Sequence, residues 1–371
     1  MKFFDLGLDD PVTRAAMDAA YGRVMDSGWM VLGPEVEAFE REFAESCGAA
    51  HAVGVGNGLD ALILALRAAG IGPGAEVIVP SHTFVATWLA VEAVGANIVP
   101  AEVDPATFTL DPAAFAAAVT PHTAAVIPVS LYGHPPDMDA IGEVARANGL
   151  FVLEDAAQSH GGRYRGRPTG SLAHATAFSF YPTKNLGALG DAGAVVTRDA
   201  ALAEKLRLLR NYGSRRKYSH EATGVNSRLD ELQAAFLRVR LSGLAAANEA
   251  RRARAAVYDQ RLGGLPGIAP PGAAEWARHV YHLYVVRAAE RDRLQAGLQA
   301  AGIETLIHYP QPCHLQPAFE RHGFRPGAFP VAERLAAEVL SLPLWPGLPI
   351  ADVEQVASAI VRLSGGADGA A

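Results

Sequence analysis

Segments typical of strands and of helices alternate between residues 51 and 153, and this alternation restricts the possible folds more than any other feature. The strand candidates are short and apolar, and they cover residues 51–55, 76–79, 96–100, 124–129 and 150–153. The helix candidates between them cover residues 59–69, 86–94 and 138–148, with a further helix start at Asp111-Pro112. Alternation over this length predicts βαβ units, and therefore an α/β fold with a mostly parallel sheet covered by helices.

The pattern changes after about residue 245. The chain has 371 residues, which is long enough for two domains. A helix rich in Arg and Ala leads into a Gly- and Pro-rich stretch at 263–267, followed by a strand at 282–286 and helices at 291–301 and 352–363. We therefore expect a large domain at residues 1–245, including an N-terminal helix at 11–26, and a small C-terminal α/β domain at residues 246–371.

Charge and cysteine content argue against several classes of function. The net charge is −7 without a long basic run, and the stretch Arg251-Arg252-Ala253-Arg254 is interpreted as the solvated face of a helix, so no nucleic-acid partner is expected. No apolar run reaches membrane-spanning length, so no membrane contact is expected either. Cys47 and Cys313 are far apart and match no metal spacing, which predicts a cytoplasmic protein without a metal site.

Lys184 is the first candidate for chemistry. It lies among apolar and aromatic residues at 178–186, followed by several glycines, which is an unusual setting for a solvated surface lysine. A lysine whose pKa is lowered becomes a nucleophile that forms Schiff bases with aldehydes. Because Lys184 and Asp155 both lie at or just beyond predicted strand ends, the sheet is expected to gather them along one edge. This pair suggests pyridoxal phosphate (PLP) chemistry.

Asp155 and the turn Gly56-Asn57-Gly58 supply the other groups that PLP requires. Asp155 follows the apolar strand at 150–153, and a buried carboxylate there would keep the proton on the pyridine nitrogen. The alternative is that Asp155 only caps the segment after it. The turn lies between a strand and a helix, where free N–H groups and the helix dipole favour a phosphate. The dinucleotide-binding motif Gly-x-Gly-x-x-Gly is incomplete here, because Leu59 stands at the position of its third glycine.

Longer segments carry a family resemblance. They cover residues 154–161, 178–187, 190–194, 226–235 and 308–310, with Glu154-Asp155-Ala156-Ala157-Gln158 and Pro182-Thr183-Lys184-Asn185 at the centre of the two most specific ones. These segments resemble the sugar-nucleotide aminotransferases of the DegT/StrS group, which are fold-type I PLP enzymes. The resemblance extends from about residue 5 to about residue 362, and it implies a mostly parallel seven-stranded sheet in the large domain.

The resemblance implies a role for each matching residue. Lys184 would bind PLP covalently, and the other cofactor-binding residues would be Asp155 at the ring nitrogen, Gln158 at the ring hydroxyl, Gly58, Leu59 and Ser179 at the phosphate, Phe84 stacked on the ring, and Asn226 reaching the phosphate of the neighbouring subunit. Asn226 thus implies a homodimer with shared active sites. One departure is visible, because the family often has Ser-Gly-Thr where this chain has Asn57-Gly58-Leu59, so a hydroxyl is lost but the backbone donors remain.

The implied reaction is a transamination. L-Glutamate would convert PLP to pyridoxamine phosphate, and a keto sugar linked to dTDP would then accept the amine. The presence of a lysine at position 184 favours transamination, because the dehydratase branch of the group has histidine in place of the Schiff-base lysine. The Asn57-Gly58-Leu59 version of the turn is similar to members that act on C3, and it predicts a 3-keto-6-deoxyhexose substrate and a 3-amino-3,6-dideoxyhexose product.

Residues for the sugar nucleotide are harder to assign. The candidates are Tyr181, His308 and Tyr309, while the basic residues at 215–217 belong to a loop that either meets the diphosphate or is merely solvated. Three alternatives stay open: a 4-keto sugar nucleotide as substrate, a cyclitol ketone as substrate, and a non-catalytic PLP-binding protein with a regulatory role.

Overall fold

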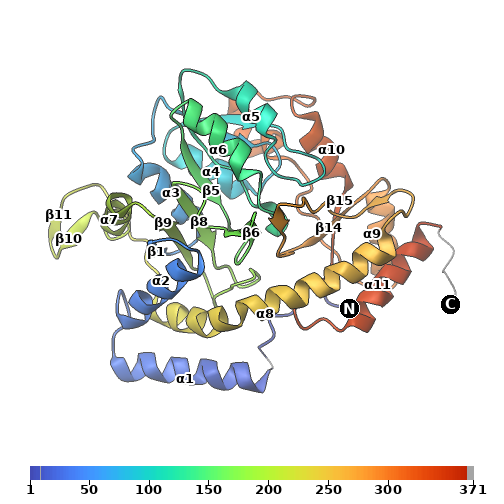
Figure 1. Cartoon of the computed structure of the whole chain (residues 1–371), viewed down its shortest axis with the longest axis horizontal. Coiled ribbons are helices and arrows are strands. Elements are labelled where there is room, and N and C mark those ends of the chain that lie inside the picture. Colours follow the sequence, from blue (N-terminus) through green and yellow to red (C-terminus); the bar gives the residue numbers. More distant parts are fainter. Residues whose placement is uncertain (9, 366–371) are drawn as a thin grey trace.

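A seven-stranded sheet forms the centre of the computed structural model, which describes residues 1–8 and 10–365 (Figure 1). Its strand order is β1-β9-β8-β5-β4-β2-β3. The strands are β1 (His51–Val55), β2 (Glu76–Pro80), β3 (Asn97–Ala101), β4 (Thr123–Val126), β5 (Phe151–Asp155), β8 (Ala175–Ser179) and β9 (Gly193–Thr197). Only β9 runs antiparallel to its two neighbours, β1 and β8. The prediction of an α/β fold with a mostly parallel sheet is therefore confirmed.

Helices cover both faces of this sheet, and the strands are apolar on both sides for that reason. The helices α3 (Gly58–Ala68), α4 (Val85–Ala93) and α7 (Ala200–Leu209) pack on one face. The opposite face is covered by α2 (Pro34–Ser46), α5 (Pro112–Ala118), α6 (Met138–Ala147) and the first half of α8 (Glu231–Leu262). Alternate residues of one strand enter different cores: Val77 and Val79 pack with α3 and α4, while Ile78 packs with α5 and α6.

Local capping explains several helix starts. The side chain of Asn57 accepts a hydrogen bond from the N–H of Asp60 at 2.8 Å, and Asp111 caps α5 in the same way before Pro112. Helix α1 (Pro11–Ser27) begins after the N-cap Asp10. These starts were readable from the sequence because each cap is supplied by a residue next to its helix.

Helix α2 was not predicted, and its N-cap Gly33 makes no side-chain hydrogen bond. Instead, the carboxylate of Glu231, at the start of α8, accepts hydrogen bonds from the N–H groups of Gly33, Glu35 and Val36 at 2.7–3.0 Å. The groups that satisfy this helix end therefore come from a residue almost 200 positions away.

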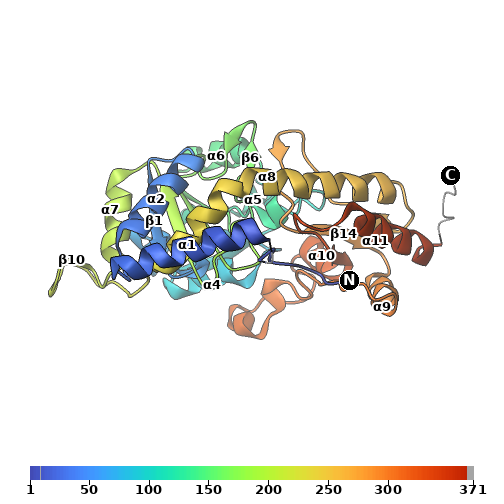
Figure 2. The same ribbon diagram turned by 90° about the horizontal axis from the view of Figure 1, so that it is seen from below.

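The C-terminal part of the chain surrounds a separate core. The second half of α8 packs there with β14 (Tyr284–Ala288), β15 (Val339–Leu342), α9 (Arg291–Ala300) and α11 (Ile350–Leu363), and β12 (Ile268–Ala269) extends the β14-β15 sheet. The expected boundary at residue 245 falls inside α8, which runs without a break along one side of the molecule (Figures 1 and 2). The division into two domains stays a prediction.

Several shorter elements lie outside the two main sheets. They are a sheet of β6 (Arg163–Tyr164), β7 (Arg167–Pro168) and β13 (Ala277–Arg278), a hairpin of β10 (Ser214–Arg216) and β11 (Ser219–His220), and helix α10 (Pro330–Glu338). The β10-β11 hairpin projects from the body in Figure 1, and α1 lies beside α8 in Figure 2. Among residues 1–8 and 10–365, the helices are all too short or too polar to cross a bilayer.

Arg251 contradicts one expectation from the sequence. Its side chain is only 2% exposed, and one terminal nitrogen lies 3.1–3.3 Å from the carbonyl oxygens of Tyr281, His282 and Leu344. The interpretation of Arg251 as part of a solvated helix face is therefore wrong. Backbone carbonyls from two distant segments accept hydrogen bonds from this one nitrogen, which offsets part of the cost of burying the charge, although Nε is buried without a partner.

Candidate active site

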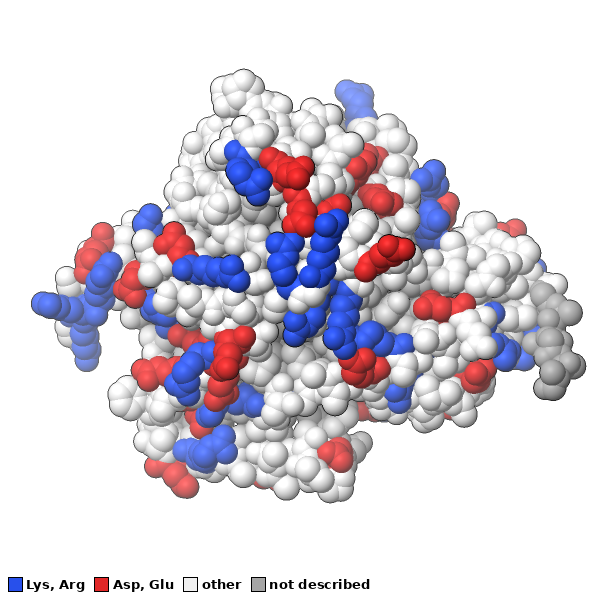
Figure 3. Space-filling view, viewed as in Figure 1, with Lys and Arg blue, Asp and Glu red and all other residues white. Residues whose placement is uncertain are grey.

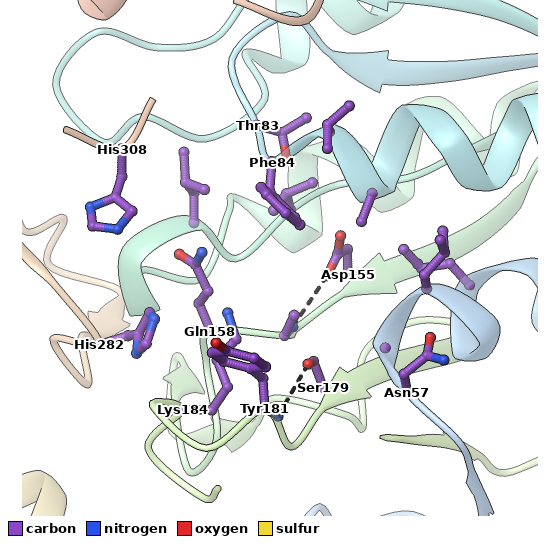
Figure 4. A pocket seen from close by; sticks show the side chains of 18 of the residues that line it. Asn57, Thr83, Phe84, Asp155, Gln158, Ser179, Tyr181, Lys184, His282 and His308 are labelled. Atoms are coloured by element: carbon purple, nitrogen blue, oxygen red, sulfur yellow. Dashed lines mark hydrogen bonds between the residues drawn. The ribbon is translucent and has the colours of Figure 1, made fainter. Parts of the chain in front are cut away.

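A cavity of about 540 Å³ opens at the carboxyl ends of β5 and β8 (Figure 4). This size is typical of sites that hold a small molecule. Ten of the predicted site residues line it together: Gly58, Leu59, Phe84, Asp155, Gln158, Ser179, Tyr181, Lys184, His308 and Tyr309. Asn226 does not line the cavity of its own chain.

Lys184 lies in the loop after β8, and its N–H donates to the carbonyl oxygen of Tyr181 at 2.8 Å, which closes a tight turn. The turn also needs Gly187, because a Cβ there would lie 2.3 Å from the carbonyl oxygen of Pro182. Burial lowers the pKa of Lys184 from 10.5 to about 8, while the negative charge of Asp155 opposes this change. Roughly a tenth of the amine is therefore uncharged at pH 7, against less than a thousandth for an ordinary lysine, and the uncharged form is the one that a nucleophile or general base requires.

Asp155 ends β5 and is held from two sides. The hydroxyl of Thr87 donates to Oδ2 at 2.9 Å, and the N–H of Ala157 donates to Oδ1 at 3.2 Å. Burial raises the pKa of Asp155, while these two hydrogen bonds and the charge of Lys184 oppose that rise. Thr87 is itself fully buried and lies 3.0 Å from the hydroxyl of Thr83. The carboxylate is thus fixed at a buried position. The contact with Ala157 is the local cap that the alternative interpretation expected, and the contact with Thr87 is additional to it.

The turn before α3 forms a narrow cradle. A Cβ on Gly58 would lie 2.5 Å from the Cβ of Ser179, so only glycine allows this approach of α3 to the end of β8. The hydroxyl of Ser227 accepts from the N–H of Gly56 at 2.9 Å and fixes the turn from the other side. Asn57 caps the N–H of Asp60, and among the described residues nothing accepts from the N–H groups of Gly58 and Leu59. Two free N–H groups at a helix start suit an anion.

Gln158, Phe84 and Tyr309 form one wall of the cavity. The side-chain oxygen of Gln158 accepts from the N–H of Tyr132 at 2.6 Å, and its amide nitrogen donates to the hydroxyl of Tyr309 at 3.2 Å. The rings of Phe84 and Tyr309 lie 5.3 Å apart at an angle of 37°. Phe84 is 49% exposed, so it presents a free aromatic surface instead of filling the core.

His308 reaches the cavity from the C-terminal part of the chain. Its Nδ1 lies 2.8 Å from the hydroxyl of Ser341, and its backbone carbonyl oxygen accepts from the hydroxyl of Tyr132. Burial lowers the pKa of His308 to about 4, and the positive charge of Lys184 acts in the same direction. His308 is therefore uncharged at neutral pH and serves as a hydrogen-bonding group.

Comparison with known proteins agrees with this geometry. The family model described as "DegT/DnrJ/EryC1/StrS aminotransferase family" matches residues 12–361. The chain belongs to this family. Its membership establishes the PLP-dependent aminotransferase class that the resemblance implied, and PLP is the cofactor of the family.

Individual members of the DegT/DnrJ/EryC1/StrS family are similar over almost the whole chain. The "Erythromycin biosynthesis sensory transduction protein EryC1" of Saccharopolyspora erythraea is 56% identical, over 94% of this chain and 95% of the relative. The "dTDP-3-amino-3,4,6-trideoxy-alpha-D-glucose transaminase" of Streptomyces venezuelae is also 56% identical, over 94% and 92%. A crystal structure of S. venezuelae DesV in complex with a ketimine intermediate has a TM-score of 0.97 at 54% identity, and it covers 99% of both chains.

The residues of this chain fit the family's cofactor. Unpartnered N–H groups at Gly58 and Leu59 match a phosphate, and a buried carboxylate at Asp155 matches a pyridinium nitrogen. Lys184 supplies an amine of lowered pKa in the same cavity. The replacement of the family's frequent Thr by Leu59 leaves the backbone donor of that position intact.

Two groups of predicted residues lie outside the cavity. Asn226 is exposed and pairs with Asn211 in an isolated bridge. Arg215, Arg216 and Lys217 are exposed at the β10-β11 hairpin, where basic side chains cover the projection seen at the left of Figure 3. A role for Asn226 in the site of a neighbouring subunit stays a prediction, and so do the two alternatives for the basic residues, contact with the diphosphate or simple solvation.

Thr87, Ser227 and His282 contribute to the site but were missed by sequence reasoning. Thr87 and Ser227 act through hydrogen bonds to residues that were predicted. Thr87 stands in no motif, and Ser227 lies in the segment 226–235 that carries the resemblance but was given no role of its own. His282 lines the cavity from the C-terminal core, although it was read only as the start of a strand. Contacts between distant segments identify the roles of all three.

Proposed function

We propose that this protein transfers the amino group of L-glutamate to C3 of a dTDP-linked 3-keto-6-deoxyhexose. The observation that carries this proposal is the placement of an amine of lowered pKa, Lys184, in one cavity with the buried carboxylate of Asp155. The identity of 56% with a transaminase named for a dTDP-3-amino-3,4,6-trideoxyglucose supports the nucleotide, the sugar class and C3 as the aminated carbon. The name of that relative also indicates that the C4 hydroxyl of the acceptor sugar needs a direct test.

The cavity residues divide the work of the reaction. When bound, PLP supplies an electron sink that stabilises negative charge on the carbon next to the transferred nitrogen. Asp155 would hold the pyridine nitrogen in its protonated form, and the N–H groups of Gly58 and Leu59 with the hydroxyl of Ser179 would hold the phosphate. The Nζ atom of Lys184 would anchor the cofactor and then accept and return the proton of the reacting carbon.

The remaining predicted residues would orient the cofactor and sugar. Phe84 would cover one face of the cofactor ring, and Gln158, already fixed by the N–H of Tyr132, would face the ring hydroxyl. Tyr181, His308 and Tyr309 would contact the sugar nucleotide. His308 can only act as a neutral hydrogen-bonding group there, since burial keeps its pKa far below neutral.

Activity with matched acceptors tests the proposal. Purified protein is supplied with L-glutamate and one of three acceptors: dTDP-3-keto-6-deoxyglucose, the corresponding dTDP-4-keto sugar, or a dTDP-3-keto-4,6-dideoxy sugar. Formation of 2-oxoglutarate with a 3-keto acceptor is expected, and Lys184→Ala should abolish it. A preference for the 4-keto acceptor would contradict C3 amination, while the two 3-keto acceptors together show whether a C4 hydroxyl is required.

A regulatory role is the second candidate, because the EryC1 relative is named as a sensory transduction protein. The lowered pKa of Lys184 would serve Schiff-base formation with PLP in either role, so amino transfer itself has to separate the two. Bound PLP without amino transfer to any of the acceptors would favour the regulatory role.

We also propose a homodimer with shared sites, in which Asn226 of each subunit serves the cavity of the other. Its exposure, and its absence from the lining of its own cavity, support this arrangement. The test mixes two inactive variants, Lys184→Ala and Asn226→Ala, under conditions that allow subunit exchange. Recovery of activity is expected because one site of each mixed dimer would be intact, and no recovery despite exchange would contradict sharing. A cytoplasmic location is proposed as well, supported by two buried free thiols.

A further inference from the structure

The side-chain amides of Asn185 and Asn248 form a hydrogen-bonded chain next to Lys184. The amide nitrogen of Asn248, on α8, donates to the carbonyl oxygen of His160 at 2.8 Å. The amide nitrogen of Asn185, the residue after Lys184, donates to Oδ1 of Asn248 at 2.8 Å and to the carbonyl oxygen of Val280 at 3.0 Å. The lysine loop, α8 and the segment before β14 are therefore joined at this point.

This chain fixes the protonation pattern of His282. The carbonyl oxygens of His160 and Val280 can only accept hydrogen bonds, so they determine which way both amide groups point. Oδ1 of Asn185 consequently faces His282, at 3.2 Å from its Nδ1. Because an amide oxygen only accepts, Nδ1 of His282 must carry the proton, and in the neutral ring Nε2 keeps a free lone pair.

His282 remains neutral and borders the reaction space. It is 7% exposed and lines the same cavity as Lys184 (Figure 4). Burial lowers its pKa well below the ordinary value, and the positive charges of Lys184 and Arg251 add to this effect, as His308 and His160 do. Among the described residues, nothing hydrogen-bonds Nε2 of His282 or Nζ of Lys184, and neither atom is sealed from the cavity.

For the other two histidines near Lys184, the neighbours do not determine which ring nitrogen carries the proton. His160 packs against Phe178 and Phe180, and both of its ring nitrogens are buried without a partner. His308 pairs with the hydroxyl of Ser341, which can either donate or accept, so its proton is not assigned by its neighbours. Of these three histidines, only His282 has neighbours that place the proton on Nδ1 and so leave Nε2 as a hydrogen-bond acceptor.

We propose that the amine of Lys184, when it is not bound to the cofactor, moves to donate a hydrogen bond from Nζ to Nε2 of His282, a contact that this structure does not contain, with Asn185 as the residue that sets the acceptor. His282 is then a positioning residue that acts through Lys184. It keeps the free amine beside the cavity centre, and it stabilises the ammonium form against the dry surroundings. This inference rests on the proposed function only as far as PLP binding to Lys184, and it is independent of the sugar.

Cofactor capture by the cofactor-free protein tests this inference without measuring turnover. Only the uncharged amine reacts, so the midpoint of the capture rate against pH reports the pKa of Lys184. His282→Phe removes the acceptor, and the midpoint is expected to fall by about one pH unit, a tenfold change in the protonation equilibrium. In His282→Gln, Asn185 should attract the amide nitrogen and leave the amide oxygen facing the cavity, so the midpoint should return close to that of the wild type. His122→Phe, at an exposed position, is the matched control.

Other outcomes separate the possibilities. An unchanged midpoint in His282→Phe, combined with a raised KM for the sugar alone, would overturn the inference and assign His282 to the sugar. Should His282→Phe fail to fold, the side-chain ¹⁵N shifts of the wild-type His282 decide: a protonated Nε2 overturns the inference, and a bare Nε2 supports it. Loss of transamination with all sugars, with these shifts and midpoints as expected, would refute the proposed function and leave this inference standing.

Discussion

The cost of burying Lys184 should be measurable as a pH-dependent penalty on stability. The pKa of Lys184 is about 8 in the folded protein, and its ordinary value is 10.5. Between these values the unfolded chain binds more protons than the folded one, so folding becomes more favourable as the pH rises. Below about pH 8 the full difference applies, which is about 3 kcal/mol at about 1.4 kcal/mol for each pH unit.

Lys184→Met removes the titrating group and keeps a flexible apolar chain of similar length. For the cofactor-free proteins, the unfolding free energy of the wild type relative to this variant should increase by about 2 kcal/mol between about pH 7 and about pH 9.5. The change with pH is more informative than the absolute difference, because the variant also deprives the carboxylate of Asp155 of its nearby positive charge.

Urea unfolding of both cofactor-free proteins at the two pH values is the assay. Lys2→Met, at an exposed position, serves as the control and should show no such change with pH. A relative free energy that stays constant within about 0.5 kcal/mol, the usual scatter of surface substitutions, would refute the reasoning. The amine would then be fully solvated, and the proposed role of Lys184 as an uncharged nucleophile near neutral pH would lose its physical basis.

Three further substitutions test the groups around the lysine. Gly58→Ala should weaken PLP binding about tenfold or more, equivalent to about 1.4 kcal/mol, because its Cβ would lie 2.5 Å from the Cβ of Ser179, and a fluorescence titration measures this. Thr87→Val removes the donor 2.9 Å from Asp155, so kcat/KM should fall about 10- to 100-fold, as expected for losing about 1.5–3 kcal/mol at a charged group. Glu231→Gln should destabilise the protein by about 1–3 kcal/mol, measured by urea unfolding. The two oxygens of the carboxylate accept from three N–H groups, and the amide of glutamine has only one acceptor oxygen.

Matched changes control for two of these, and a null outcome is defined for the third. Gly22→Ala lies in open space on α1, and unchanged PLP affinity there would separate a local clash from a general effect of alanine. Equal kcat/KM in Thr87→Val and wild type would show that Ala157 alone holds the carboxylate. Glu204→Gln changes an exposed carboxylate and should leave stability unaltered, whereas a loss as large as in Glu231→Gln would contradict the capping role.

The sequence determined the fold class and identified ten of the residues that line the cavity. Strand and helix periods, together with caps such as Asn57 and Asp111, are local properties, so the βαβ pattern of the large sheet could be predicted from residues close together in the chain. The carboxyl ends of neighbouring strands meet at one edge, and for this reason Asp155 and Lys184 could be expected to share a site.

Only the tertiary structure decided which residues surround that site. Glu231 caps α2 from almost 200 positions away, Thr87 holds Asp155, and Asn185 and His282 meet across the join between the lysine loop and the C-terminal core. Arg251 shows the same limit, since a basic stretch indicates solvent until two distant segments supply the carbonyl oxygens that bury it. Local sequence sets the backbone path and the reactive groups, whereas burial and hydrogen-bond partners, which set each group's pKa, arise from segments that only folding brings together.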